Sequence, residues 1–519
     1  MQHLKNNLEN KIPEQSNKTD TILAWLDFGP YSYVNFGIIN ELSKLKKYDF
    51  VGIVTTEQDV NFFQKQKMIG FKEILYYPDC YIGKKNFSLS HLRKIEDDLE
   101  LDLWKEIFSE RSFYKFWTYF HKFSREEILS IVENSIIFFN EILKKYHPKI
   151  VIMQQPGENI SNLLLYRIAK KNRIEVLMPN NLHYKNRIHI SNSLTSDEIS
   201  EEFKKSSYIN NFEEDVGEEF LEKVEHSETL KIVASFDSGM QTLSQKINHY
   251  FRRFSNDLEP IYKNNGKSKT KLFKQRMKNY FEFKKREKFL EKNAIKKIED
   301  EKYHYFPLQS EPESTILALS PFFGNQIALI ETIAKAIPID STLYVKEHPF
   351  QREKLWRSVG DYKKIINIPN VKFIHPNVRS LDILKNSQSV IAISGSTGFE
   401  ALFYKKPVIL FGDEHYDCVS TVTKVQNIND LPKVIRNAIE DFKFDQSELN
   451  LFMKILNENS LPIPYASMLK DGVSLSSIQR NERSFDLTNS NFQKFIEKYG
   501  YEFKLIAKTI FSRYEKISQ

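Results

Sequence analysis

The feature that most constrains the fold is a repeated alternation of short apolar runs and helical segments from Ser314 onward. Apolar runs such as SVIAIS and PVILFG alternate with segments of helical spacing such as QIALIETIAKAI and SLDILKNS. Each strand–helix–strand unit carries the chain across one face of a sheet, so the repetition predicts a parallel sheet covered by helices on both faces. We expect its strands at STILALSPF, STLYVKEHP, SVIAIS and PVILFG.

A second alternation lies near the start of the chain. TILAWLDFG and YDFVGIVTT have the composition of strands, and NFGIINELSKLKK between them has helical spacing. Helices are expected over about 88–146, and PKIVIMQQPGEN is expected to be a strand followed by a loop. The chain is therefore predicted to be an α/β protein of two Rossmann-like, doubly wound domains that face each other across a cleft.

The two alternations divide the chain of 519 residues into five expected stretches. These are a polar leader (1–20), a first Rossmann-like domain (21–195), a charged helical insertion (196–302), a second Rossmann-like domain (303–470) and terminal helices that pack back on the first domain (471–519). A hydrophobic content of 41% is enough to build a core in each domain.

The formal net charge of +7 hides two strongly biased stretches. Residues 197–228 hold twelve Asp and Glu against three Lys, and residues 263–299 hold fourteen Lys and Arg against four Glu. The basic stretch could meet nucleic acid, anionic lipid or an acidic polymer, or it could be a solvated helix face. We favour an anionic membrane surface over nucleic acid as its partner.

Other features indicate a cytoplasmic protein without a cofactor or metal. No uncharged apolar run of about 18 residues is present, and the first twenty residues lack the apolar middle of a signal peptide. Cys80 and Cys418 are too few for a disulfide framework and lack the spacing of a zinc site, so we expect both to be packing residues.

The clearest candidate site is the turn in SVIAISGSTGFEAL. Its candidate residues are Ser394, Gly395, Ser396, Thr397 and Gly398, after which a helix is expected to begin near Phe399. A helix start offers unpaired N–H groups and a partial positive charge, and glycine lets a phosphate approach the backbone. The alternative is that Ser396 and Thr397 only cap the helix. No lysine follows as in an ATPase P-loop.

Two further groups of residues complete this candidate binding site. Glu400 follows the turn, where its carboxylate could accept hydrogen bonds from a ribose or could simply suit the helix dipole. Lys346, Glu347 and His348 stand before Pro349 at the expected end of a strand. His348 could donate to a phosphate oxygen, unless this segment is only a strand that runs out into solvent.

The first domain offers two candidate catalytic carboxylates. Glu158 lies in the Pro-Gly loop of MQQPGEN, and Asp27 ends the first expected strand. A carboxylate opposite a phosphate site could act as the base for an acceptor hydroxyl or stabilise an oxocarbenium-like centre. A loop-capping role is the alternative for either residue.

The motifs FPLQSEPE, VKEHP and SGSTGFEALFYKKPVILFG resemble the bacterial capsule polysaccharide biosynthesis family, which includes Kdo transferases, over about residues 303–430. The resemblance implies a GT-B fold, a nucleotide bound mainly by the second domain, and sugar transfer from a nucleotide-activated donor without an essential metal. By position it also assigns His348, Pro349, Ser394, Ser396 and Thr397 to the donor site. It identifies no catalytic carboxylate.

The leading hypothesis is a glycosyltransferase of capsule or other surface polysaccharide that uses a nucleotide sugar such as CMP-Kdo and a glycan or lipid-linked acceptor. Such an enzyme could sit at the inner face of the cytoplasmic membrane through residues 263–299. One alternative is a teichoic-acid-type glycerophosphotransferase, which would need a histidine base such as His183 or His189. The others are a sugar-nucleotide epimerase and a non-catalytic subunit of a polysaccharide assembly complex.

Overall fold

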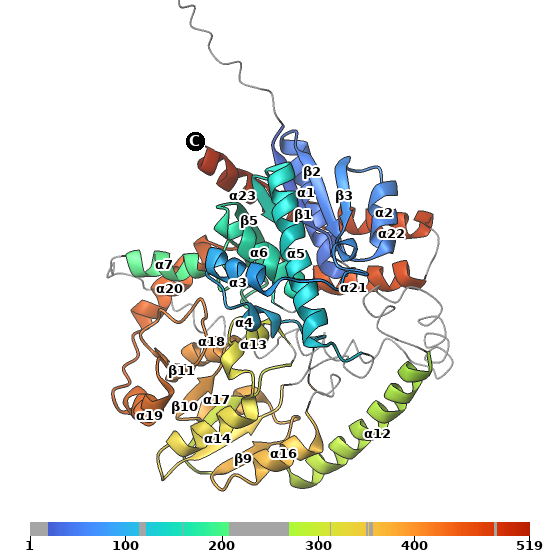
Figure 1. Cartoon of the computed structure of the whole chain (residues 1–519). Helices are drawn as coiled ribbons and strands as arrows, with labels where there is room; N and C mark the ends of the chain where they lie inside the picture. Colours follow the sequence, from blue (N-terminus) through green and yellow to red (C-terminus); the bar gives the residue numbers. More distant parts are fainter. Residues whose placement is uncertain are drawn as a thin grey trace, which may run out of the picture.

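Two parallel α/β halves, one above the other in Figure 1, make up the computed structural model of the chain. The structure describes residues 19–27, 29–113, 121–157, 159–206, 269–311, 313–348, 351, 357–481 and 485–518. Each half is built on one sheet, and apolar side chains cover both faces of each sheet. The predicted fold class of two doubly wound domains is confirmed.

The first sheet has seven strands. Five neighbouring strands, in the order β3-β2-β1-β4-β5, are parallel. In sheet order the strands are β13 (Leu461–Pro462), β6 (Arg187–Ser191), β5 (Glu175–Asn181), β4 (Ile150–Ile152), β1 (Thr21–Trp25), β2 (Asp49–Val54) and β3 (Phe71–Tyr76). β1 is buried along its whole length. Its side chains alternate between two cores, with Ile22 and Ala24 in one and Leu23 and Trp25 in the other.

Helices cover both faces of this sheet. They are α1 (Pro30–Leu45), α2 (Glu57–Lys65), α3 (Leu89–Leu99), α4 (Leu103–Ile107), α5 (Arg125–Tyr146) and α6 (Ile160–Lys171), with a short 3-10 turn η1 (Tyr77–Cys80). The next helix, α7 (Asp197–Lys205), instead packs on the core of the second half through Ile199 and Phe203. α5 begins with a capping box, in which Ser124 accepts from the Glu127 N–H and the Glu127 carboxylate accepts from the Ser124 N–H. α1 and α6 pack on opposite faces of the sheet.

The last three helices of the chain pack on the first half, although they follow the second half in sequence. They are α21 (Tyr465–Asn481), α22 (Phe485–Lys498) and α23 (Gly500–Ser518), and α21 and α23 lie against α1. The contact between α1 and α23 is close, since a Cβ on Gly37 would clash with the ring of Phe503. These helices complete the core on the α1 side.

The second sheet has six parallel strands in the order β9-β8-β7-β10-β11-β12. The strands are β7 (Tyr303–Pro307), β8 (Thr342–Lys346), β9 (Val371–Ile374), β10 (Ser389–Ala392), β11 (Val408–Leu410) and β12 (Val422–Lys424). The helical elements are α12 (Lys269–Asn293), α13 (Ser314–Leu317), η2 (Pro321–Phe323), α14 (Gln326–Ala336), α16 (Val359–Ile366), α17 (Ser380–Asn386), α18 (Ser396–Phe403), η3 (Ile428–Asp430), α19 (Leu431–Glu440) and α20 (Gln446–Glu458).

Two details of the second half differ from the prediction. STILALSPF is not a strand: it contains α13 and the start of η2, and the strand is β7, which lies earlier at YHYFP. A short apolar run cannot by itself distinguish a strand from a buried helical turn, and here the turn buries Ile316 and Leu317. α18 begins at Ser396, three residues before the expected start at Phe399.

The chain returns from the second half to the first between α20 and α21. β13 pairs antiparallel with β6 through Leu461 and Ile188. Arg187 on β6 donates to the Asn457 carbonyl at 2.7 Å and to the Ser460 carbonyl at 2.8 Å. These contacts fix the crossing point to the edge of the first sheet. Among the helices of the described ranges, none combines the length and apolar content needed to cross a bilayer.

Candidate functional site

The strand order of the second sheet defines where a ligand can bind. β7 and β10 are neighbours, but the chain leaves them toward opposite faces, since α14 packs on one core and α18 on the other. At such a switch point the loops after the two strands separate and leave a crevice at the carboxyl edge of the sheet. Gln309, which follows β7, spans this crevice, because its Nε2 donates to the Ser394 carbonyl after β10 at 2.6 Å.

The turn after β10 requires glycine at two positions. Gly395 has φ +93° and ψ 179°, a region that residues with a side chain hardly occupy, and a Cβ there would lie 3.1 Å from Gln309 Oε1. A Cβ on Gly398 would lie 2.5 Å from the hydroxyl of Tyr416. That hydroxyl donates to the Gly395 carbonyl at 2.7 Å. The close approach of Tyr416 therefore fixes the shape of the turn.

The hydroxyl groups of the turn have different environments. Ser396 and Thr397 are partly exposed in the first turn of α18, whose N-cap residue is Gly395. They therefore do not act as the N-cap, which was the alternative reading. Ser394 is fully buried, and its Oγ has no hydrogen-bond partner among the described residues. Only Ser396 and Thr397 thus offer partly exposed hydroxyls to a ligand.

A carboxylate already sits at the start of α18. Glu414, in the loop after β11, accepts a hydrogen bond from the Gly395 N–H. Its other oxygen lies 3.7 Å from Nδ1 of His415. Because carboxylates and phosphates bind helix N-termini through the same N–H groups and dipole, Glu414 holds a position that an incoming anion would compete for.

Glu400 lies one turn further along α18. It is partly exposed, yet surrounding protein displaces water from it, so burial raises the pKa of its carboxyl to about 7, against a smaller lowering by the hydrogen bond with Ser396. Near neutral pH this group can either donate or accept a proton.

The ionisable residues at the end of β8 point to opposite faces of the sheet. Lys346 is 3% exposed and donates to Ser380 Oγ at 3.0 Å, and burial lowers the pKa of its ammonium to about 8. Glu347 faces the other way and accepts from Arg357 and from the Tyr362 hydroxyl. His348 is partly exposed, and its backbone N–H donates to Glu347 Oε1 at 2.7 Å.

Arg357 connects the ends of β7 and β8. Its guanidinium donates to the Glu347 carboxylate, to Glu311 Oε2 at 3.0 Å and to the Gln309 carbonyl at 2.9 Å. Arg357, Glu347 and Glu311 are all nearly buried, so this ion-pair cluster is structural and supports the loop that carries Gln309. Of the predicted group at this strand end, His348 alone keeps partial exposure among the described residues, and Pro349 lies outside them.

The first sheet has a corresponding switch point between β1 and β4. Asp27 follows β1, is partly exposed and accepts a hydrogen bond from the Thr55 hydroxyl after β2. Asn35 on α1 spans the two strand ends, since its Nδ2 donates to the Trp25 carbonyl at 2.8 Å and to Gln154 Oε1 at 3.5 Å. Glu158, the other predicted carboxylate, lies outside the described residues.

The turn between β5 and β6 brings the first half against the site. His183 is exposed, but neighbouring protein lowers the pKa of its imidazole by desolvation, and Glu414, His415 and Glu313 of the second half act on its charge. The next residue, Tyr184, is buried with its ring centroid 6.2 Å from that of Phe399 in α18. The carboxyl edges of the two sheets therefore face each other.

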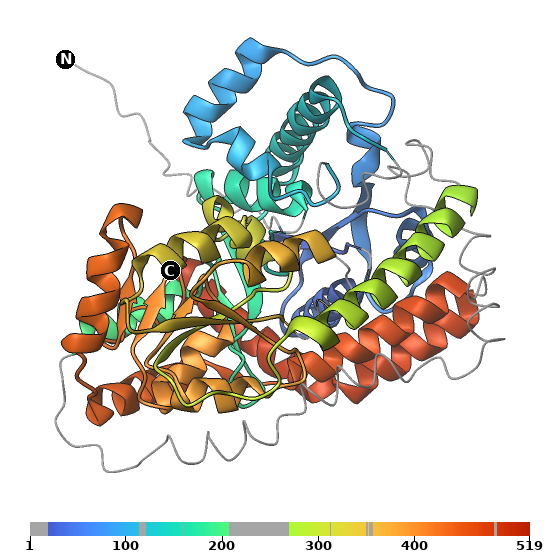
Figure 2. The same ribbon diagram turned by 90° about the horizontal axis from the view of Figure 1, so that it is seen from below.

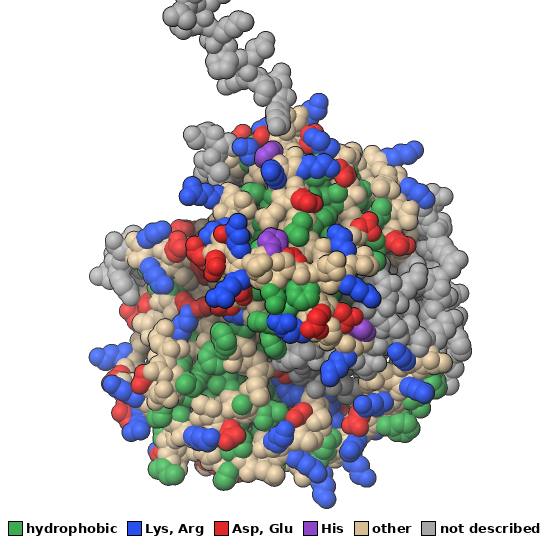
Figure 3. All heavy atoms as spheres, viewed as in Figure 1, with side chains coloured by type: hydrophobic (Ala, Val, Ile, Leu, Met, Phe, Trp, Pro, Cys, Tyr) green, Lys and Arg blue, Asp and Glu red, His purple; other side chains and the backbone are tan. Residues whose placement is uncertain are grey.

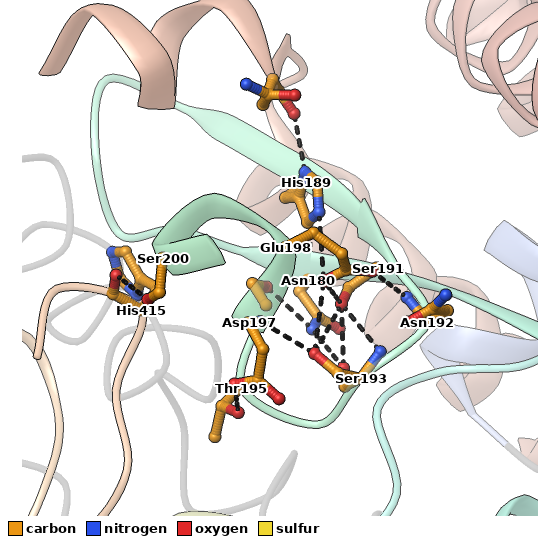
Figure 4. A network of polar contacts seen from close by, with 12 residues as sticks. Asn180, His189, Ser191, Asn192, Ser193, Thr195, Asp197, Glu198, Ser200 and His415 are labelled. Atoms are coloured by element: carbon orange, nitrogen blue, oxygen red, sulfur yellow. Dashed lines mark hydrogen bonds and ion pairs between the residues drawn. The ribbon is translucent and has the colours of Figure 1, made fainter. Parts of the chain in front are cut away.

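Two polar links hold the halves in this arrangement, and both can be followed in Figure 4. Ser200 on α7 donates to the His415 carbonyl at 2.7 Å. His189 is buried, with Nδ1 donating to the Asn459 carbonyl at 2.7 Å and Nε2 3.6 Å from Glu198. His189 thus fixes the crossing segment, which removes it as a candidate for a second histidine base.

Sequence reasoning gave little weight to several residues that the structure places at the site. Gln309 lies in the FPLQSEPE motif, but the motif assigns it no role, and Glu414 stands in no motif, although only Asp413 separates it from the apolar run VILFG. The strand-end rule that selected His348 also applies to Glu414, and it could have identified that residue. Tyr416 and Arg357 act through long-range contacts that no spacing in the sequence signals.

Two Rossmann-like sheets whose carboxyl edges face each other define the GT-B class of fold. Residues 209–444, somewhat less than half of the chain, match the model of the family described as "Capsule polysaccharide biosynthesis protein". This match confirms the resemblance found in the sequence. No curated protein matches the chain.

Several solved structures are similar at low identity. A beta Kdo 2,7 transferase, KpsC from Thermosulfurimonas dismutans, is 15% identical over 71% of this chain and 87% of its own, with a TM-score of 0.28. The UDP-GlcNAc 2-epimerase of Methanocaldococcus jannaschii, in complex with UDP-GlcNAc and UDP, is 16% identical over 84% and 99%, with a TM-score of 0.25. A glycosyltransferase from Rickettsia africae is 13% identical over 90% and 100%, with a TM-score of 0.26. TM-scores this low say nothing about the activity of this chain.

Proposed function

We propose that this protein is a glycosyltransferase of capsule or other surface polysaccharide synthesis that transfers a sugar from a nucleotide-activated donor to a glycan or lipid-linked acceptor. One observation carries the proposal: the glycine turn before α18 lies at the switch point of the second sheet and faces the β5–β6 turn at the carboxyl edge of the first. The family match over residues 209–444 agrees with it. A CMP-activated sugar such as CMP-Kdo is our first candidate donor.

The donor phosphate would lie against the first turn of α18. Its negative charge would meet the positive end of the helix dipole in competition with the Glu414 carboxylate, and the hydroxyls of Ser396 and Thr397 would donate to its oxygens. His348 would donate to the same phosphate from the end of β8. Glu400, one turn further along α18, would accept hydrogen bonds from sugar hydroxyls when it is ionised.

The acceptor would approach from the first half. Asp27 would take the proton of the acceptor hydroxyl, whose oxygen would attack the anomeric carbon as the bond from that carbon to the phosphate oxygen breaks. The charge that develops on the leaving nucleotide would be stabilised by α18 and His348 rather than by a divalent cation. Glu158 remains a second candidate for the proton acceptor, and metal-independent activity in the presence of EDTA is part of the proposal.

Titration calorimetry with CMP, CDP, UDP and GDP tests the donor site first. We expect one nucleotide to bind, and the double substitution Ser396→Ala with Thr397→Val to weaken it about 10²- to 10⁴-fold, because hydrogen bonds to charged groups contribute about 1.5–3 kcal/mol each. The matched control is Ser447→Ala in the first turn of α20, which should bind nucleotide like the wild type. Absence of binding by all four nucleotides would refute the donor site.

Turnover with acceptor tests the class of reaction. Asp27→Asn should lower kcat about 10²- to 10⁴-fold and leave the nucleotide Kd unchanged, and Glu158→Gln is compared in parallel. If only the Glu158 change matters, that residue is the proton acceptor. Conversion of the sugar nucleotide without any acceptor would identify an epimerase instead, and transfer of a glycerophosphate group would identify the phosphotransferase alternative.

A further inference from the structure

One side of α12 packs on the second half of the molecule. Arg286 and Leu290, four residues apart, are 2% and 3% exposed. Arg286 Nη1 donates to the Gln351 carbonyl at 3.3 Å, and α12 lies against α16. Residues spaced by four lie on one face of a helix, so this face is the anchored side of α12.

The other side of α12 exposes a row of large apolar side chains. Phe273, Met277, Tyr280 and Phe281 are 52%, 41%, 56% and 62% exposed. Their spacing of four, seven and eight residues places them on one face, and at about 100° per residue this face lies opposite Arg286 and Leu290. With a rise of about 1.5 Å per residue, the row is about 12 Å long.

Lysines line the same exposed side of the helix. Lys284 and Lys288 continue the row by one and two turns, and Lys284 Nζ lies 5.9 Å from the ring centroid of Tyr280. Lys274, Lys278 and Lys285 are exposed on its flank. Figure 3 shows this arrangement as hydrophobic side chains bordered by Lys and Arg at the lower right, where α12 lies in Figure 1.

We propose that α12 is an interfacial membrane anchor that lies on an anionic bilayer surface with Phe273, Met277, Tyr280 and Phe281 inserted and the lysines at the headgroups. A short row of large apolar side chains that projects from a single helix is suited to insertion between lipid headgroups. Lysines beside it attract anionic lipid by about one kcal/mol each, or about fivefold in affinity. The occupant is thus a lipid surface of negative charge.

The proposed anchor rests on exposed apolar side chains as well as on the positive charge of residues 263–299. Arg286 belongs to that basic stretch but is buried, so it cannot reach a membrane, and substituting it would disturb the packing of α12. The exposed aromatic row, which the charge count did not include, supplies the second requirement for interfacial binding. Anchoring would hold the proposed transferase beside a lipid-linked acceptor, but its test does not depend on catalysis.

Co-sedimentation of the full chain with vesicles tests the proposal. Vesicles of phosphatidylcholine in which phosphatidylglycerol replaces part of the lipid should bind the wild type, and phosphatidylcholine alone should not. We expect Lys284→Glu with Lys288→Glu to weaken binding at least about 25-fold, from two lysines at about fivefold each. Tyr280→Ser with Phe281→Ser should weaken it about tenfold through lost apolar burial.

The matched control is Lys433→Glu with Arg436→Glu, the same change of charge on exposed positions of α19. It should sediment like the wild type. The proposal would be overturned if the α19 control lost as much binding as the α12 variants, or if both α12 variants bound like the wild type. It would also be overturned if the wild type bound equally well to vesicles of phosphatidylcholine alone. Lys284→Gln with Lys288→Gln, a milder pair, should show an intermediate loss, and it replaces the Glu pair if circular dichroism shows that variant unfolded.

Calorimetric nucleotide binding, measured on the same preparations, separates this inference from the proposed function. A protein that binds nucleotide but no vesicles would overturn the membrane anchor alone. A protein that binds vesicles through α12 but no nucleotide would leave the anchor standing and refute the donor site.

Discussion

Replacing Glu414 by Gln should make the protein less stable and, at the same time, a better nucleotide binder. The Glu414 carboxylate accepts from the Gly395 N–H, which a donor phosphate would need. A hydrogen bond to a charged acceptor contributes about 1.5–3 kcal/mol, and one to a neutral amide oxygen about 0.5–1.5 kcal/mol. The Gln variant should therefore lose about 1–1.5 kcal/mol of stability, and nucleotide, which has less to displace, should bind about tenfold tighter.

The two readouts are the midpoint of urea unfolding and the nucleotide Kd from calorimetry. Glu448→Gln is the matched control, because Glu448 is a buried carboxylate of the same half that accepts from the Ser420 N–H at 2.9 Å, away from the switch point. It should lose stability without any gain in nucleotide affinity. If Glu414→Gln binds nucleotide as weakly as the wild type or more weakly, the phosphate does not compete for the Gly395 N–H and the reasoning fails.

Three further predictions follow from contacts near the site. Gly398→Ala should lower the free energy of unfolding by about 1–3 kcal/mol, because the new methyl group clashes with the Tyr416 hydroxyl. In a double-mutant cycle measured by urea unfolding, Tyr416→Phe should relieve much of that loss; additive effects would contradict the clash. The pKa of Glu400 is raised from 4.5 to about 7, so its protonated carboxyl stabilises the folded state. This stabilisation is complete below pH 4.5 and is lost as the pH rises to about 7. Glu400→Gln should therefore gain stability relative to the wild type across that window and stay constant above it, and a flat difference would contradict the raised pKa. Arg357→Ala should cost about 3–5 kcal/mol, because it leaves Glu347 buried without its cation; a loss under 1 kcal/mol would show that the cluster is not structural.

The fold could be predicted from the sequence because buried parallel strands are continuous apolar runs. SVIAIS and PVILFG contain β10 and β11, and the loop after each lies at the carboxyl edge of the sheet, as the strand–helix alternation requires. The prediction failed at STILALSPF, where apolar residues of similar composition form a helical turn and a 3-10 turn instead. Local pattern does not contain the tertiary contacts that decide between these outcomes.

The candidate site could be predicted only as a place, not as a set of contacts. The rule that ligands bind at strand ends led to the turn at Gly395 and to Asp27, both of which lie at switch points. It could not show that Lys346 points away into a buried hydrogen bond, or that Glu414 occupies the helix start, since these depend on side-chain direction and on partners 34 and 19 residues away. The roles of these residues in binding and catalysis stay predictions.

The return of the chain through β13 has a consequence for how the molecule is made. Phe492 and Phe503, which follow the second half in the sequence, fill the core beneath α1. The ribosome therefore has to synthesise the whole second half before α1 is covered by these rings. The amino-terminal half expressed alone would leave Tyr33 and Phe36 without their ring contacts to Phe492. A separate first unit therefore has to combine this half with the helices that follow β13.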